Sequence, residues 1–235
     1  MMKIVFTPDW FLTSDVLIEV FSFLTLLSFF ALAFQSYRLS KKKSVLYLGF
    51  GFFLIALGQL ASILTKLVLY YDTGVTHGVG VAVITYNIVR NVDIFYYLGF
   101  FFFRLFTLLG LYTIYKLPLE KFAGEFFLYL YLITIISWMS NSYYYIYNLT
   151  ALVLLIYIIN KNYKMYLKDK VKNTRIVVFA FSVLAVAQFI FLFSQLRELY
   201  AVGQVMQLAS YIILLILIAK IIKDGKKEKP SGNNP

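Results

Sequence analysis

The chain alternates between long apolar runs and short polar or basic connectors. Several runs reach the ~20 residues that an α-helix needs to cross a bilayer. We expect an all-α polytopic membrane protein with seven transmembrane helices. Their approximate bounds are Val16–Phe34, Val45–Tyr70, Val92–Tyr115, Leu119–Trp138, Tyr143–Ile159, Thr174–Phe193 and Leu199–Ile222.

The polar residues inside these runs recur at helical spacing, which places each set on one face of its helix. Lipid cannot hydrogen-bond to such groups, so these faces are expected to point into the bundle, mostly in its outer half. The inner halves of several runs are almost purely apolar. The pattern therefore predicts a ligand pocket that opens outward, lined by Arg104, Gln59, Lys66, Asn148, Gln188, Gln204, Gln207 and Glu19.

Arg104 is the most unusual of these residues, because it lies in the middle of the apolar stretch FYYLGFFFFRLFTLLGLY. An arginine at the centre of a spanning helix costs roughly 2.5–3.5 kcal/mol on insertion scales. Its expected partner is Glu19 on the first helix or Glu125 on the fourth; failing both, an anionic ligand or carbonyl and Gln/Asn oxygens are expected to satisfy the guanidinium. The alternative is structural, because buried amides and hydroxyls in membrane helices often serve as interhelical hydrogen-bond donors and acceptors.

The composition agrees with a membrane protein, with 61% hydrophobic and 14% charged residues and a mean hydropathy of +0.79. We expect one domain, residues 1–222, followed by a disordered basic tail, residues 223–235. Acidic residues precede the first run and basic residues follow it, the reverse of a signal peptide, so this helix is expected to be retained. Asp15 is expected to be its N-cap.

Basic residues collect at one side of the predicted helices. Apart from Arg104, that side has seventeen of the 22 Lys and Arg residues, and the other has four: Lys3, Lys66, Arg90 and Arg197. Because basic residues favour cytoplasmic connectors, the N-terminus is expected outside and the C-terminus in the cytoplasm. This distribution also explains the net charge of +11 without a nucleic-acid partner.

Several classes of chemistry lack their residues in this sequence. Cysteine is absent, and the single histidine, His77, lies among glycines in a connector. The chain has no zinc-protease, serine-hydrolase or paired-aspartate motif. The seventh run has no lysine midway along it, as a retinal protein would require. We therefore expect neither an enzyme nor a bound cofactor.

An internal similarity relates two of the runs. Phe50–Tyr71 aligns without gaps on Phe179–Tyr200. Helices 1–3 and 5–7 would share one orientation, so a parallel 3+1+3 repeat is geometrically allowed. This topology resembles that of the small sugar-transporting SWEET proteins. Those proteins hinge on prolines in their repeated helices, whereas all four prolines of this chain lie outside the predicted spans. The resemblance therefore covers topology alone.

Three functions fit these features. The leading hypothesis is a multi-pass cell-membrane receptor or sensor that binds a small polar or anionic ligand from the outer side. Because the chain ends soon after the last helix, its signal is expected to pass to a separate cytoplasmic or membrane partner. The alternatives are a small-solute transporter of 3+1+3 architecture and a structural subunit of a membrane complex.

Overall fold

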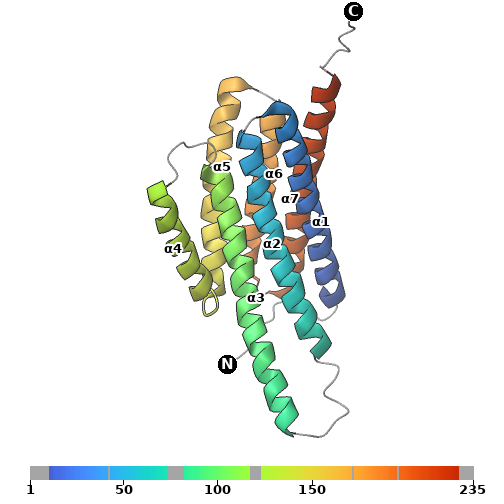
Figure 1. The fold of residues 1–235 in the computed structure, drawn as a ribbon, viewed down its shortest axis with the longest axis vertical. Helices are drawn as coiled ribbons and strands as arrows, with labels where there is room; N and C mark the ends of the chain where they lie inside the picture. The colour runs from blue at the N-terminus through green and yellow to red at the C-terminus, as the bar shows by residue number, and fades with distance from the viewer. Residues whose placement is uncertain are drawn as a thin grey trace, which may run out of the picture.

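A computed structural model describes residues 11–41, 43–72, 82–116, 123–170, 172–194 and 196–227. These residues contain no β-strand. They form seven helices: α1 (Leu12–Ser40), α2 (Lys43–Asp72), α3 (Ala82–Lys116), α4 (Ala123–Met139), α5 (Tyr144–Asp169), α6 (Lys172–Phe191) and α7 (Arg197–Lys227) (Figure 1).

The helix bounds differ from the sequence predictions at three points. α3 begins at Ala82, ten residues before the predicted start (92 minus 82), and extends beyond its neighbours at the lower end in Figure 1. α7 continues through Lys227, so the first part of the predicted disordered tail is helical; residues 228–235 lie outside the described residues. Asp15 is not the N-cap of α1, because that position is held by Phe11.

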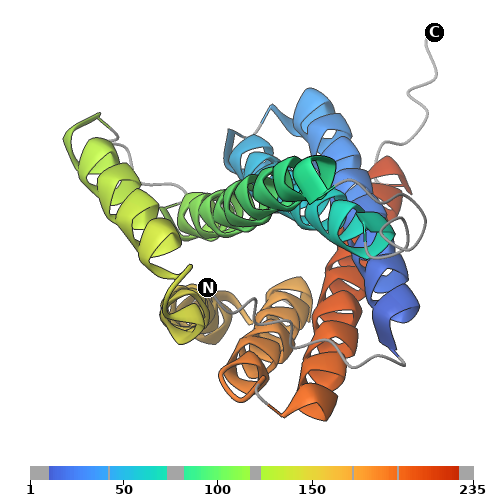
Figure 2. The same cartoon turned by 90° about the horizontal axis from the view of Figure 1, so that it is seen from below.

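The helices pack in a closed ring in the order α1, α2, α3, α5, α6, α7, with α7 returning to α1. α4 packs beside α3 and α5, and it lies at the edge of the bundle in both views (Figures 1 and 2). α1, α3, α5 and α7 all begin at the lower end of Figure 1, which we call the N-terminal end of the bundle. Residues near these starts therefore meet residues near the ends of α2, α4 and α6.

The middle of the ring is filled by large apolar side chains from most of the helices. The rings of Phe52 on α2 and Phe181 on α6 stack with their centroids 6.3 Å apart, and Phe29 on α1 packs on Phe52 at 4.2 Å. Leucines such as Leu155 on α5 and Leu214 on α7 complete this core. The centre of the ring is therefore apolar.

Small residues allow α2 and α3 to approach closely, as is common between membrane helices. A Cβ atom added to Gly110 would lie 2.5 Å from the carbonyl oxygen of Gly51 and 2.6 Å from Cγ1 of Ile55. A Cβ atom on Gly58 would lie 2.9 Å from the carbonyl oxygen of Phe103. Side chains at these glycines would force the two helix backbones apart.

The outer surface of the bundle is apolar as well. Large hydrophobic side chains face outward from many helices, including Phe127, Leu64 and Ile216, each more than half exposed. Water would penalise such a surface, whereas hydrocarbon accepts it. Among the described residues, five helices are long and apolar enough to cross a membrane: Thr13–Arg38, Val45–Val68, Tyr96–Lys116, Asn173–Phe191 and Glu198–Lys223.

These features indicate a helical membrane protein. The apolar part of α4, Phe127–Met139, is shorter than the five spanning segments. α5 is long, but tyrosines and one asparagine interrupt its apolar first half and basic residues occur in its second half.

α1 and α5 end in the same way. Lys41 and Lys170 both adopt a left-handed conformation, with φ of 56° and 50°. Their backbone N–H groups donate to the carbonyl oxygens of Tyr37 and Tyr166 at 2.7 and 2.8 Å. Each of these bonds satisfies one of the carbonyl groups that a helix end leaves without a partner.

Candidate functional site

A buried network of charged residues joins α1, α2 and α7 at the N-terminal end of the bundle. Nζ of Lys66 on α2 donates to Asp15 Oδ2 at 2.6 Å and to Glu19 Oε1 at 2.7 Å, both on α1. It also donates to the hydroxyl of Tyr200 on α7 at 2.9 Å. These three bonds use all three donors of the ammonium group.

Neighbouring side chains extend the network. Ser62 Oγ donates to Glu19 Oε1 at 3.0 Å, and Gln204 Nε2 donates to the Tyr200 hydroxyl at 2.9 Å. The Tyr200 hydroxyl in turn donates to Asp15 Oδ1 at 3.2 Å. We call the six residues Asp15, Glu19, Ser62, Lys66, Tyr200 and Gln204 the ionic cluster.

The spacing of these residues along the chain explains how the ionic cluster forms. Each helix contributes two residues four positions apart, which share one helix face. The pairs are Asp15 and Glu19 on α1, Ser62 and Lys66 on α2, and Tyr200 and Gln204 on α7. The ring order brings these faces together, because α1 lies between α2 and α7.

The ionic cluster is shielded from solvent and carries unequal charges. Asp15 is 0% exposed, Glu19 3% and Lys66 5%. With ordinary ionisation, two carboxylates face one ammonium, which leaves one negative charge in excess. A buried ion pair is costly to break, because removing one partner leaves an uncompensated charge in a medium of low dielectric constant.

Arg104 lies elsewhere, on α3 where it faces the turn between α4 and α5. Its side chain is half-buried, and Nη1 donates to Oδ1 of Asn141 at 2.6 Å. Of the expected partners, Glu19 binds Lys66 instead, whereas the expectation of an Asn or Gln oxygen is met by Asn141. The side chain of Glu125 lies outside the described residues. Among the described side chains, no carboxylate forms a salt bridge with Arg104.

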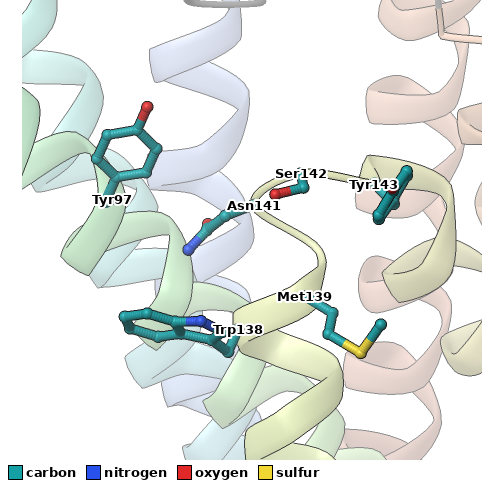
Figure 3. A pocket seen from close by; sticks show the side chains of 6 residues that line it. All are labelled: Tyr97, Trp138, Met139, Asn141, Ser142 and Tyr143. Carbon is teal, nitrogen blue, oxygen red and sulfur yellow. The ribbon is translucent and has the colours of Figure 1, made fainter. Parts of the chain in front are cut away.

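The turn between α4 and α5 holds Asn141 toward Arg104. Backbone N–H groups of Ser140, Asn141 and Ser142 donate to carbonyl oxygens at the end of α4, which closes a tight turn. Figure 3 shows the Asn141 side chain directed between Tyr97 and Trp138, which come from α3 and α4. The Asn141 amide thereby connects the α4–α5 turn to Arg104 on α3.

A pocket of about 510 Å³ opens at this turn. Its lining is mainly aromatic, with a thioether and two small polar groups: Tyr97, Trp138, Met139, Asn141, Ser142 and Tyr143 (Figure 3). Apolar walls with a few polar groups are typical of small-molecule sites. Since Asn141 both lines the pocket and accepts the hydrogen bond from Arg104, the guanidinium lies next to this space.

The remaining predicted site residues are buried between helices of the ring. Gln188 Nε2 on α6 donates to Gln207 Oε1 on α7 at 3.5 Å, and Asn148 Nδ2 on α5 donates to the carbonyl oxygen of Phe191 at 3.3 Å. Gln59 on α2 is buried as well. The expected single polar zone is therefore divided between the ionic cluster, these interhelical amides and the surroundings of Arg104.

Four residues of these arrangements were not among the predicted site residues: Asp15, Ser62, Tyr200 and Asn141. Asp15 was expected only as a helix cap, and no role in the site was predicted for Tyr200. The i, i+4 spacing of Asp15 with Glu19, and of Tyr200 with Gln204, was the available signal. No pattern in the sequence paired Asn141 with Arg104.

Among the described residues, no group of three or more acidic or histidine side chains is arranged to hold a metal ion. Comparison of the chain with protein-family models, with curated proteins and with solved structures found no match.

Proposed function

We propose that this protein is a receptor-like or sensor-like membrane protein that binds a small anionic ligand at Arg104. In this proposal all seven helices span the membrane, and the N-terminal end of the bundle faces outside, as the distribution of lysine and arginine predicts. The pocket beside Asn141 would then open toward the outer face of a cell membrane.

The observation that carries the proposal is the pairing of Arg104 with a neutral amide. A guanidinium inside an apolar segment needs acceptors, and its strongest partners are carboxylate and phosphate groups, which it binds with two parallel hydrogen bonds. Nη1 is taken by Asn141, an uncharged acceptor. An anion entering the adjacent pocket would supply a negative charge that no described carboxylate brings to Arg104 through a salt bridge, and aromatic side chains would cover its apolar part.

Signal transfer would follow from the position of Arg104 between two parts of the bundle. A ligand held by Arg104 on α3 and by Asn141 in the turn before α5 favours the conformers in which these elements are close. The opposite ends of both helices carry basic residues, such as Lys116 and Lys168. A separate partner could read a displacement of these ends, and anionic lipids would hold them near the membrane surface.

Fluorescence of Trp138 tests binding at this place. The chain has two tryptophans, so Trp10→Phe leaves Trp138 as the reporter in the pocket wall. We expect a saturable fluorescence change when the purified protein is titrated with sodium acetate, phosphate or sulfate at constant ionic strength. Arg104→Gln should abolish this change, whereas Arg38→Gln, which removes an exposed arginine on α1, should preserve it. Equal titrations in Arg104→Gln and the parent would remove Arg104 from the proposed site.

A second candidate function, a small-solute transporter, is favoured by signs of an internal repeat. The left-handed lysines that end α1 and α5, Lys41 and Lys170, are 129 residues apart (170 minus 41). α2 and α6 begin at Lys43 and Lys172, which have the same separation. The hairpins α1–α2 and α5–α6 therefore correspond without a gap at their connections.

Contacts inside the two hairpins support the same correspondence. The hydrogen bond from Ser62 to Glu19 links α2 to α1, and the bond from Asn148 to Phe191 links α5 to α6. Glu19 and Asn148 are again 129 residues apart (148 minus 19), as are Ser62 and Phe191. Two hydrogen bonds at equivalent positions are not expected from apolar composition alone.

The centre of the ring and the third helices extend the comparison. Phe52 and Phe181, equivalent at the same offset, stack on each other, as residues near a two-fold axis between repeats would. Gly110 on α3 packs on the backbone of Gly51 on α2, and Ser210 on α7 donates to the carbonyl of the equivalent residue on α6, Ala180. α3 and α7 would thus occupy equivalent places.

If Gly110 on α3 corresponds to Ser210 on α7, then Arg104 corresponds to Gln204. Each lies six residues before that contact residue (110 minus 104; 210 minus 204). The Arg104–Asn141 pair and the ionic cluster would then lie at the two junctions between the repeats, α3 with α5 and α7 with α1. Transporters built from repeats commonly bind substrates and coupling ions at such junctions.

Chemical cross-linking of the apolar core distinguishes the transporter hypothesis from the receptor hypothesis. The chain has no cysteine, so Phe52→Cys with Phe181→Cys can be joined selectively by a short bifunctional thiol reagent. A transporter must open this apolar core, so cross-linking should stop uptake of the anions into proteoliposomes without abolishing the Trp138 response. Absence of uptake before cross-linking would exclude transport of those anions and leave the receptor proposal standing.

A further inference from the structure

Both carboxylate oxygens of Asp15 accept hydrogen bonds, whereas only one oxygen of Glu19 does so among the described residues. Asp15 accepts hydrogen bonds at Oδ2 from Lys66 and at Oδ1 from Tyr200. Glu19 accepts two bonds at Oε1, from Lys66 and Ser62, while Oε2 is buried and has no hydrogen-bond partner among the described residues. An ionised carboxylate with a bare oxygen in an apolar interior is unfavourable.

The charges around Glu19 make ionisation still less favourable. The titratable groups that face it are Asp15 on its own helix, Lys66 on α2 and Tyr200 on α7. Lys66 is shared between the two carboxylates, so its single positive charge cannot neutralise both. A like charge one helical turn away disfavours ionisation of the second carboxylate.

From this geometry we infer that Glu19 is a proton-binding site, with the proton on Oε2. Binding forms one O–H bond from a solvent proton and a lone pair of Oε2, and it breaks no bond within the protein. The net charge of the ionic cluster changes from −1 to 0. Asp15 offers no equivalent position, because Lys66 and Tyr200 donate to both of its oxygens.

A proton suits the ionic cluster better than a metal cation does. The Lys66 ammonium lies within 2.7 Å of both carboxylates, where a metal ion would otherwise sit. A sodium or calcium ion would need several oxygen ligands, whereas the oxygens of Asp15 and Tyr200 are already used in hydrogen bonds. The buried cluster offers one bare oxygen, which is enough for a proton.

This site is distinct from the anion site proposed at Arg104, and it adds a pH-dependent element to the bundle. Loss of the proton would return an excess negative charge to the junction of α1, α2 and α7 and weaken their packing. Opening of that junction toward solvent would in turn favour proton release. Proton binding is therefore coupled to the closed arrangement of these helices.

Infrared spectroscopy of the purified protein tests the inference. At neutral pH we expect a C=O stretching band of a protonated carboxylic acid that shifts in D₂O. Glu19→Gln, which is nearly isosteric, should remove the band, whereas Glu198→Gln, which replaces an exposed acid on α7, should leave it unchanged. Disappearance of the band in Asp15→Asn but not in Glu19→Gln would overturn the assignment to Glu19, and so would absence of the band in the parent protein.

The pH dependence of the melting temperature gives a second readout, which can be measured on the parent protein first. If the folded protein holds one proton more than the unfolded chain, the free energy of unfolding decreases as pH rises above the range where an exposed glutamate ionises, about pH 4.3. The melting temperature of the parent should therefore fall with rising pH, and this slope should be smaller in Glu19→Gln. Repeating the titration with choline in place of sodium identifies the ligand, since a slope that depends on sodium would contradict a proton site.

Discussion

Replacing Lys66 with methionine is expected to destabilise the protein more than any other single change at the ionic cluster. Methionine keeps most of the side-chain volume but leaves Asp15 and Glu19 buried without a cation. Removing one partner of a buried ion pair typically costs about 3–5 kcal/mol. For a chain of this size, that loss corresponds to a fall of roughly 6–20 °C in the melting temperature.

The expected loss in Lys66→Met can be assigned to charge by two further variants. Lys164→Met removes an exposed lysine of α5 and should change the melting temperature little. Adding Asp15→Asn and Glu19→Gln to Lys66→Met makes the cluster neutral and should recover much of the stability. All variants are compared in one detergent at one scan rate, because membrane proteins often unfold irreversibly. A Lys66→Met protein as stable as the parent would mean that the two carboxylates do not depend on this ammonium group.

Gly110→Val is expected to produce the second large effect, by separating α2 from α3. The new Cβ would overlap the carbonyl oxygen of Gly51 and lie 3.1 Å from the backbone nitrogen of Ile55. Backbone atoms cannot rotate away as a side chain can, so the helices themselves must move. Overpacking of this kind costs about 1–3 kcal/mol and sometimes more.

Thermal unfolding and anion binding of Gly110→Val should change together. α3 carries Arg104, so a displaced α3 should weaken the response of Trp138 to anions as well as lower the melting temperature. Ala209→Val supplies the control, because it places the same side chain at an exposed position of α7. A Gly110→Val protein with the stability of the Ala209→Val control would contradict the close packing of α2 on α3.

The helices were largely predictable because their signals are local. Apolar length and helical spacing identified a helix at each of the seven places where the structure has one. Their ends were less predictable: α3 begins at Ala82 within a polar segment, and α7 continues past Ile222 through lysines. Polar residues form helices as readily as apolar ones when a long helix precedes or follows them, so hydropathy underestimates helix length.

The partners within the site were not predictable from spacing alone. Helical periodicity shows that Glu19 and Lys66 each lie on a polar face, but it does not show which helices are neighbours. Their pairing depends on the contact of α1 with α2, and that of Lys66 with Tyr200 requires α7 to close the ring. For Arg104 the sequence likewise left Glu19, Glu125, an anion and amide oxygens open, and the packing of α3 beside the α4–α5 turn selects Asn141.

The central claim is that Arg104 holds a small anion, and ligand-dependent thermal stabilisation tests it most directly. The parent, Arg104→Lys and Arg104→Gln proteins are heated with sodium acetate, phosphate or sulfate at constant ionic strength. Stabilisation grows with the ratio of ligand concentration to Kd, by about 2.7 kcal/mol at a hundredfold excess. We predict that at least one anion stabilises the parent, that Arg104→Lys responds less because lysine lacks the planar pair of donors, and that Arg104→Gln does not respond. Equal stabilisation of the parent and Arg104→Gln, or no response of the parent to any anion, would contradict the claim.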